Sequence, residues 1–172
     1  MRTLFSILML CILISCDLKP GKTGKPSSES IKLDRPLYKM SYASDWKVDS
    51  SDKDFDWDSY FTIDSRSGSG FISIFVFNTG IDAKDAVNQQ IQAHLAKTMK
   101  NGKVTSFDKW GEYKGEGANI KGKLMGAFDG NINIFSYSTD SSSFIAVYQL
   151  MESEKEKDQP GIDLIKSSFH LK

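Results

Sequence analysis

The chain has 172 residues, and its 22 basic residues balance its 22 acidic residues, so the formal net charge is zero. A balanced charge argues against nucleic-acid binding, which depends on a basic excess. Hydrophobic residues make up 40% and aromatic residues 12% of the chain, which excludes a wholly disordered protein and is enough to build a core. Length and composition together predict one globular domain.

The first 15 residues have the pattern of a signal peptide. Arg2 supplies a positive charge, and an apolar run from Leu4 to Ile14 follows, interrupted only by Ser6. As a helix this run would be about 16 Å long, roughly half of the hydrocarbon core of a bilayer. Residues 1–15 are therefore too short to anchor the chain as a transmembrane helix and are predicted to be removed.

The signal ends in Leu13-Ile14-Ser15-Cys16, which resembles the lipobox of bacterial lipoproteins. The resemblance implies cleavage before Cys16, a diacylglyceryl group on its sulfur, and hence a membrane partner reached through this lipid anchor. The alternative is an ordinary secretory signal with a chance cysteine at this point. Asp17 resembles the enterobacterial signal for retention in the inner membrane, which favours that membrane, facing the periplasm, over the outer membrane.

Cys11 and Cys16 are the two cysteines of the chain. With Cys11 removed and Cys16 lipidated, the domain has no thiol for a disulfide, a nucleophile or a metal site. Residues 17–35 are rich in Lys, Ser, Gly and Pro, so residues 16–35 are predicted to be the lipidated cysteine and a flexible tether. The globular domain is predicted to span residues 36–172.

The domain pattern predicts strands at 37–42, 46–48, 60–63 and 71–77, the last apolar on both faces and therefore central. A long helix is expected next, with Asp82 as N-cap, Asp85 completing an acidic capping box, and a left-handed end at Asn101-Gly102. Its core-facing stripe repeats every four residues and consists of Ala83, Val87, Ile91, Leu95 and Met99.

Four more strands are predicted at 104–107, 118–125, 131–137 and 144–150, with the glycines between Gly111 and Gly130 marking turns and bulges. A charged loop at 152–158 is expected to lead through Pro160 to a short closing helix that carries Ile162, Ile165 and Phe169. This order predicts the α+β class, with an antiparallel β-sheet sandwiched by helices.

Three segments resemble PsbP-like domains. Residues 38–48 resemble the opening strand and the turn before its tryptophan, although Ala43 stands where the family usually has proline. Trp110-Gly111 and the closing Ser167-Ser168-Phe169 follow in the family's order. The resemblance implies the α/β/α sandwich of the PsbP/Mog type, which also includes DcrB-like lipoproteins, mostly binding or assembly modules without shared catalytic residues or a cofactor.

Alternating carboxylates form the first candidate site. Asp52, Asp54, Asp56 and Asp58 would share one face of an extended segment, and oxygen ligands of this kind suit Ca²⁺. The glycine and glutamate of an EF-hand loop are absent, because Trp57 and Ile63 occupy those positions. Two interpretations stay open: a solvated acidic loop, or a weak site for a divalent cation or a basic partner.

Aromatic residues form the second candidate, a ligand groove lined by Trp46, Trp57, Trp110 and Tyr113, with burial in the core as the alternative. Residues 117–123 match the spacing of a phosphate-binding loop, but Leu124 replaces the Ser or Thr that would hold Mg²⁺ and a strand follows. That match is rejected.

Two functions are carried forward. The first is a membrane-anchored, non-enzymatic binding or assembly module of the cell envelope, with a protein partner and no cofactor. The alternative is an envelope hydrolase or ligand-processing enzyme with a site assembled around His94, the one histidine placed beside a helical stripe. Whether a carboxylate and a hydroxyl lie within hydrogen-bond reach of His94 discriminates between them.

Overall fold

The computed structural model describes residues 29–48 and 58–172. This part of the chain forms ten strands, two α-helices and one short 3-10 turn. Their bounds in chain order are β1 Ser30–Asp34, β2 Tyr38–Ala43, β3 Lys47–Val48, β4 Tyr60–Asp64, β5 Phe71–Phe77, α1 Ala83–Lys97, β6 Lys103–Trp110, β7 Tyr113–Leu124, β8 Phe128–Ser138, β9 Ser143–Met151, η1 Glu152–Glu154, α2 Lys155–Ser168 and β10 His170–Leu171.

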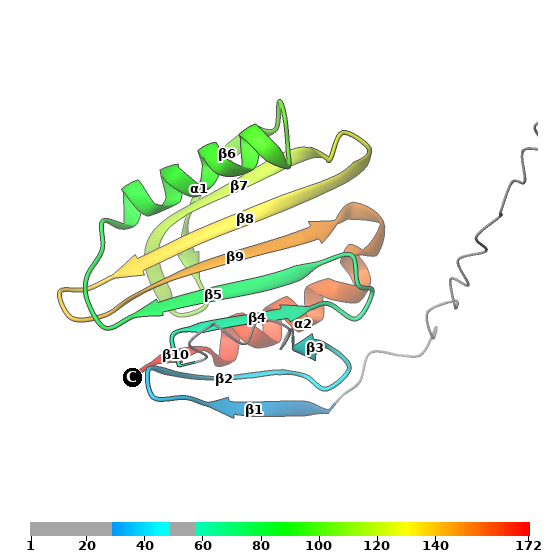
Figure 1. The fold of residues 1–172 in the computed structure, drawn as a ribbon. Helices are drawn as coiled ribbons and strands as arrows, with labels where there is room; N and C mark the ends of the chain where they lie inside the picture. Colours follow the sequence, from blue (N-terminus) through cyan, green and yellow to red (C-terminus); the bar gives the residue numbers. More distant parts are fainter. Residues whose placement is uncertain (1–28, 49–57) are drawn as a thin grey trace, which may run out of the picture.

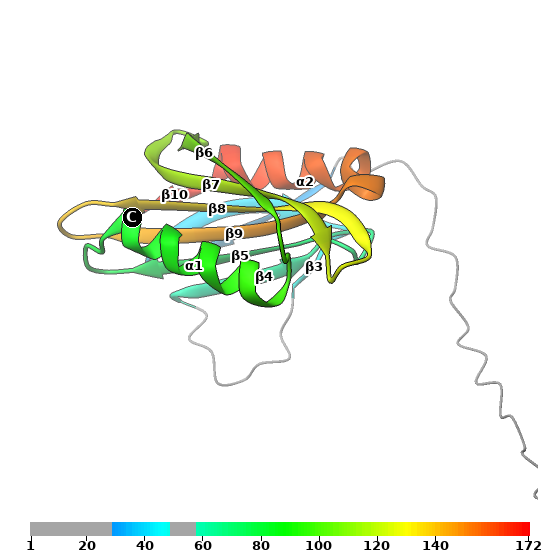
Figure 2. The ribbon, with the colours of Figure 1, turned by 90° about the horizontal axis from the view of Figure 1, so that it is seen from above.

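A seven-stranded antiparallel sheet dominates the domain, in the order β3-β4-β5-β9-β8-β7-β6 (Figure 1). β5 lies inside this sheet, as its two-sided apolar pattern predicts, and pairs with β9 over all seven of its residues. α1 and α2 lie on opposite faces of the sheet (Figure 2). The predicted α+β class, an antiparallel sheet between helices, is confirmed.

α1 covers the β7–β8 half of one face. Asp82 caps it as predicted, because its carboxylate accepts a hydrogen bond from the Asp85 N–H at 2.9 Å. Val87 is buried and Ile91 packs beside it. The helix ends at Lys97, earlier than predicted, and the left-handed residue is Asn101 in a separate following turn (φ 61°). The buried Met99 therefore belongs to the turn and not to the helix.

The opposite face carries the larger core, between the sheet, α2 and β2. Aromatic rings dominate it: Phe144 lies 4.8 Å from Phe169 and 5.3 Å from Trp110, measured between ring centroids. All three side chains are essentially inaccessible to solvent. This aromatic cluster fixes the end of α2 against the sheet.

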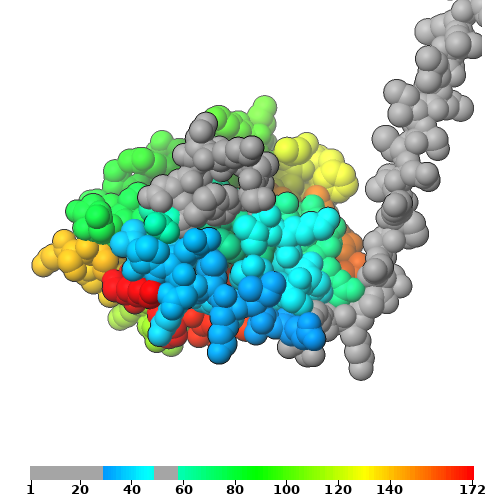
Figure 3. Space-filling view, turned by 60° about the horizontal axis from the view of Figure 1, so that its bottom comes forward, coloured from blue at the N-terminus to red at the C-terminus, as the bar shows by residue number. Residues whose placement is uncertain are grey.

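A second, three-stranded sheet has the order β1-β2-β10 and lies on the face seen in Figure 3. β1 pairs with β2 from Ser30↔Ala43 to Asp34↔Lys39, so residues 30–34 belong to the domain and not to the predicted tether. Most of the β1 side chains are exposed. Backbone hydrogen bonds hold this strand, and Leu33 is its one side chain that packs against the core, so its composition did not reveal it.

α2 begins at Lys155, so the predicted charged loop at 152–158 is wrong for most of its length. Pro160 lies inside the helix although it has no N–H to donate. The helix forms because tertiary contacts hold its first turns: Asp158 is completely buried and accepts hydrogen bonds from the β4–β5 turn.

β7 runs over twelve residues, further than predicted, and contains several of the glycines expected in turns. Gly111 and Gly126 do form turns with positive φ (61° and 77°), and the predicted bulge lies between Phe107 and Lys109. Gly111 tolerates no side chain, because a Cβ there would lie 2.2 Å from the Lys166 carbonyl oxygen. No helix in residues 29–48 or 58–172 is long and apolar enough to cross a membrane.

Candidate functional site

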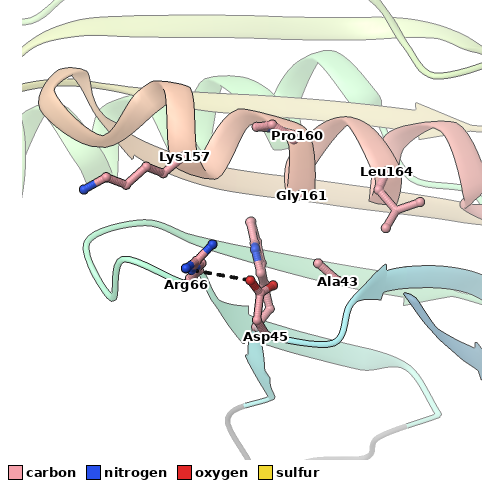
Figure 4. A pocket seen from close by; sticks show the side chains of 8 residues that line it. Ala43, Asp45, Arg66, Lys157, Pro160, Gly161 and Leu164 are labelled. Atoms are coloured by element: carbon pink, nitrogen blue, oxygen red, sulfur yellow. Dashed lines mark ion pairs between the residues drawn. The ribbon is translucent and has the colours of Figure 1, made fainter. Parts of the chain in front are cut away.

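A small pocket lies between α2, the residues that follow β2, and the β4–β5 turn (Figure 4). Its volume is about 70 Å³. Its lining combines apolar and charged side chains: Ala43, Asp45, Trp46, Arg66, Lys157, Pro160, Gly161 and Leu164.

Trp46 and Gly161 set the depth of the pocket. The indole of Trp46 is 6% exposed and lies directly on the backbone of α2 at Gly161. A Cβ at Gly161 would lie 2.2 Å from the indole Cζ2 atom, so only glycine lets the helix and the ring approach this closely. The backbone N–H of Trp46 donates to the Ala43 carbonyl oxygen at 3.0 Å, which holds the turn after β2 in place.

Charged groups form the rim of the pocket. The Arg66 guanidinium Nε lies 3.5 Å from the Asp45 carboxylate Oδ2, and Figure 4 shows this pair. Both side chains keep about a quarter of their surface accessible, so the pair contributes less than about 1 kcal/mol. The Lys157 ammonium donates to Glu154 at 2.6 Å, within the first turn of α2. Two ion pairs therefore lie at the rim of the pocket.

Asp158 holds the β4–β5 turn beside the pocket. Its Oδ2 accepts hydrogen bonds from the Ser65 hydroxyl at 2.8 Å and from the Ser67 hydroxyl at 2.6 Å. The Ser65 hydroxyl also accepts a bond from the Gly70 N–H at 3.0 Å. A buried carboxylate with this many donors is structurally satisfied, and it positions Arg66 between the two serines.

The structure separates the aromatic residues predicted to share a groove. Trp46 lines the pocket, whereas Trp110 is fully buried in the aromatic core further along α2. Tyr113 packs against that same core and its hydroxyl accepts a hydrogen bond from the Leu171 N–H at 2.8 Å. Trp57 lies outside the described residues. Of the three described members of this set, Trp46 alone lines the pocket.

The acidic and lipidation candidates fall mostly outside the structure. Asp52, Asp54, Asp56 and Cys16 lie outside the described residues, and Asp58 is exposed in a turn before β4. Within residues 29–48 and 58–172, no group of three His, Cys, Asp or Glu side chains could hold a metal ion. The metal and lipid assignments stay predictions.

His94 is half-buried on α1, where burial lowers the pKa of its imidazole. No hydroxyl or carboxylate of residues 29–48 or 58–172 hydrogen-bonds to this imidazole. Sequence reasoning did not single out Arg66, Asp158 or Gly161, which build the pocket. The sequence signal for this pocket is Asp158 one helical turn before Gly161, and such a pair is a weak indication of a pocket.

No protein-family model matches the chain, and no curated protein sequence matches it. Among solved structures it is similar to a protein of Bacteroides thetaiotaomicron, with 14% identity and a TM-score of 0.48, covering 78% of this chain and 45% of that one. The chain thus spans less than half of that protein.

Two further solved structures are similar over nearly their whole length. Cyanobacterial PsbP (CyanoP) from Synechocystis is 11% identical with a TM-score of 0.45, covering 88% of this chain and 96% of that one. LpqN of Mycobacterium tuberculosis, a protein involved in cell envelope biogenesis, is 10% identical with a TM-score of 0.42, covering 83% and 90%. These are likenesses of backbone arrangement and assign no function to this chain.

Proposed function

We propose that this chain is a bacterial lipoprotein, anchored through Cys16, whose domain is a non-enzymatic binding or assembly module of the cell envelope. The observation that carries the binding role is the size and lining of the pocket beside α2. Its volume of about 70 Å³ is several times smaller than the roughly 300–1,000 Å³ of ordinary small-molecule sites. A pocket of this size suits one side chain of a protein partner.

The lining supports the same proposal. Trp46, Pro160 and Leu164 offer an apolar floor. Arg66 and Lys157 lie at the rim, where each is paired with a carboxylate, Asp45 and Glu154. Interfaces concentrate binding energy where one anchor side chain enters such a pocket and is ringed by polar contacts. The partner chemistry that fits is an apolar side chain flanked by polar groups that join these two ion pairs, on an envelope protein.

The anchor places this partner in or on the same membrane. From Cys16 to Glu29 there are 13 peptide steps, which span at most about 45 Å even when fully extended. A domain held within that reach cannot cross a periplasm. With Asp17 after the lipidated cysteine, the inner membrane, on its periplasmic face, is the proposed location.

Site-specific crosslinking tests the binding role. A photoreactive amino acid replaces Leu164, a half-buried residue of the pocket, and the control carries the same probe at the exposed Ser141. We expect a discrete protein adduct from position 164 that disappears when Ala43→Trp fills the pocket and is absent from position 141. Equal adducts from both positions, or adducts insensitive to Ala43→Trp, would refute the pocket as the binding site.

Cell fractionation tests the anchor. Cys16→Ser removes the thiol that the lipid needs, so we expect an unprocessed precursor or a released soluble form in place of a processed membrane-bound protein. Cys11→Ser is the matched control and should leave processing unchanged. A processed Cys16→Ser protein that still partitions into detergent would contradict the lipoprotein proposal.

The alternative function, an envelope hydrolase around His94, gains no support from the surroundings of that imidazole. We expect His94→Gln to leave the position-164 adduct unchanged. The same variant would abolish turnover if His94 were a general base.

A further inference from the structure

The β7–β8 turn exposes two large apolar side chains at its tip. Met125 is 84% exposed and Phe128 is 58% exposed, whereas most other large apolar residues of the described chain are covered. The turn lies at one end of the main sheet, where Leu124 and Phe128 form the last pair of the β7–β8 ladder (Figure 1). Exposed apolar residues at the tip of a turn mark a contact surface, because leaving them in water is unfavourable.

The turn is held rigidly. The Ala127 N–H donates to the Leu124 carbonyl oxygen at 3.0 Å, and the Met125 N–H donates to the Thr98 carbonyl oxygen at 2.8 Å, at the end of α1. Met125 has φ 50° and Gly126 has φ 77°. Asn, Asp or Gly ordinarily occupies both positions of such a turn, so a methionine there retains an apolar tip at a conformational cost.

Lysines lie on the segments that lead to the tip. Lys97 and Lys100 lie at the end of α1, and Lys103 opens β6 directly opposite Lys121 of β7. None of these four pairs with a carboxylate of residues 29–48 or 58–172. Two lysines opposite each other on neighbouring strands repel, and this repulsion favours the binding of an anion between their ammonium groups. The acidic Asp129 of the turn is already paired with Lys123 at 2.7 Å.

The described chain begins at the same end of the molecule as this tip. Ser30 pairs with Ala43 beside the pocket, the pocket includes the start of α2, and the preceding η1 contacts β8 next to the turn. In Figure 1 the start of β1 and the β7–β8 turn both lie at the right-hand end. The 13 peptide steps between Cys16 and Glu29 are therefore long enough for the tip to reach the bilayer that holds the lipid.

We infer that the β7–β8 turn is a membrane-docking site, in which Met125 and Phe128 enter the interface of the bilayer and the four lysines bind anionic headgroups. This inference rests on the proposed lipid anchor. A lysine near an anionic membrane surface strengthens binding about fivefold. The four unpaired lysines and the apolar tip would hold the domain in one orientation, with the pocket beside α2 close to the membrane.

A fluorescent probe at the tip tests the inference. Met125→Cys is made in the full chain, labelled with an environment-sensitive fluorophore, and reconstituted into phosphatidylcholine vesicles that contain phosphatidylglycerol. Ser141→Cys, in the turn at the opposite end of the sheet, is the matched control. We expect a blue-shifted emission at position 125 that spin-labelled lipids quench, and neither effect at position 141.

One variant and one change of lipid give the result more detail. The substitutions Lys100→Gln and Lys103→Gln, made in the labelled Met125→Cys chain, should remove most of the quenching. Vesicles without phosphatidylglycerol should have the same effect on the Met125→Cys chain. Emission at position 125 equal to that at position 141 overturns the inference. A blue shift that occurs without vesicles also overturns it, because protein and not lipid then covers the tip. The wild-type chain is labelled in parallel. It takes up the fluorophore only if Cys11 has not been removed or Cys16 carries no lipid, and either result contradicts the proposed anchor. The difference from wild type still decides the docking site.

Discussion

At the scale of single residues, Asp158 shows how a buried charge serves the fold. Its carboxylate is completely inaccessible and receives two serine hydroxyls from the β4–β5 turn. Removing one partner of a buried hydrogen bond lowers stability by more than the bond itself contributes, because the group left behind then has neither its partner nor water to bond to. This residue therefore links α2 to the turn that carries Arg66.

We expect Asp158→Ala to lower the free energy of unfolding by about 3 kcal/mol, because the Ser65 and Ser67 hydroxyls lose their acceptor inside the protein. Urea unfolding measures the change. Glu156→Ala, at an exposed position of the same helix turn, is the control and should change stability by less than about 0.5 kcal/mol. Equal effects of the two substitutions would show that Asp158 does not hold the turn.

Tyr148 predicts a pH dependence. Burial, together with the nearby Asp163 carboxylate, raises the pKa of its phenol from the ordinary 10.0 to about 12. Between these values the unfolded chain loses a proton that the folded chain keeps, so stability is full below pH 10 and falls as the pH rises toward 12. Across this pH window we expect the free energy of unfolding to fall by about 2 kcal/mol more in wild type than in Tyr148→Phe. Parallel urea titrations of both proteins measure it, and identical curves would contradict the assignment.

At the scale of elements, α2 is decided by packing and not by propensity. Gly161 and Pro160 are the two poorest helix formers, and they are adjacent near its centre. The helix persists because Ile162 and Ile165 are buried in the main core and because Trp46 occupies the space that a side chain at Gly161 would need. Tertiary contacts thus outweigh an unfavourable local sequence.

Gly161→Ala separates the two effects. Helix propensity alone predicts that alanine stabilises α2 by about 1 kcal/mol. The new methyl group would displace the Trp46 indole, so we expect the free energy of unfolding to fall by about 1–3 kcal/mol in total. Tryptophan emission should shift to the red as the indole becomes exposed. Ser167→Ala on the exposed side of α2 is the control. A stabilised Gly161→Ala protein would show that the indole moves at no cost.

At the scale of the whole molecule, the two ends of the described chain are joined. β2, near the beginning, pairs with β1 on one side and with β10, at the end, on the other. Phe169 precedes β10, and its ring lies 5.9 Å from Tyr38 of β2 and 4.8 Å from Phe144 of β9, measured between centroids. This one ring therefore connects the small sheet, the large sheet and α2.

We expect Phe169→Ala to lower the free energy of unfolding by about 3–5 kcal/mol, because the cavity opens where the three layers meet. His170→Ala removes only an exposed contact to Glu112 and should lower the free energy of unfolding by less than about 1 kcal/mol. Thermal unfolding followed by circular dichroism measures both. A Phe169→Ala protein that unfolds in two separate transitions would show that the ring also couples the two sheets.

The sequence by itself determined the features that depend on local patterns. The strands 71–77 and 144–150, the capping of α1 by Asp82 and the α+β class follow from side-chain periodicity, because a half-buried or fully buried element must repeat its apolar residues at its own period. The proposed signal and lipobox are also local, since they consist of consecutive residues read without any fold.

The tertiary structure alone decided β1, the length of α2 and the pocket. β1 is held by backbone bonds to β2, which leave no mark on the side-chain pattern. The first turns of α2 depend on Asp158 and on serines about 90 residues away, and the pocket unites Trp46, Arg66 and Gly161 from three separate segments. Distant residues meet only when the chain has folded, because the contacts that stabilise them are formed between elements and not within them.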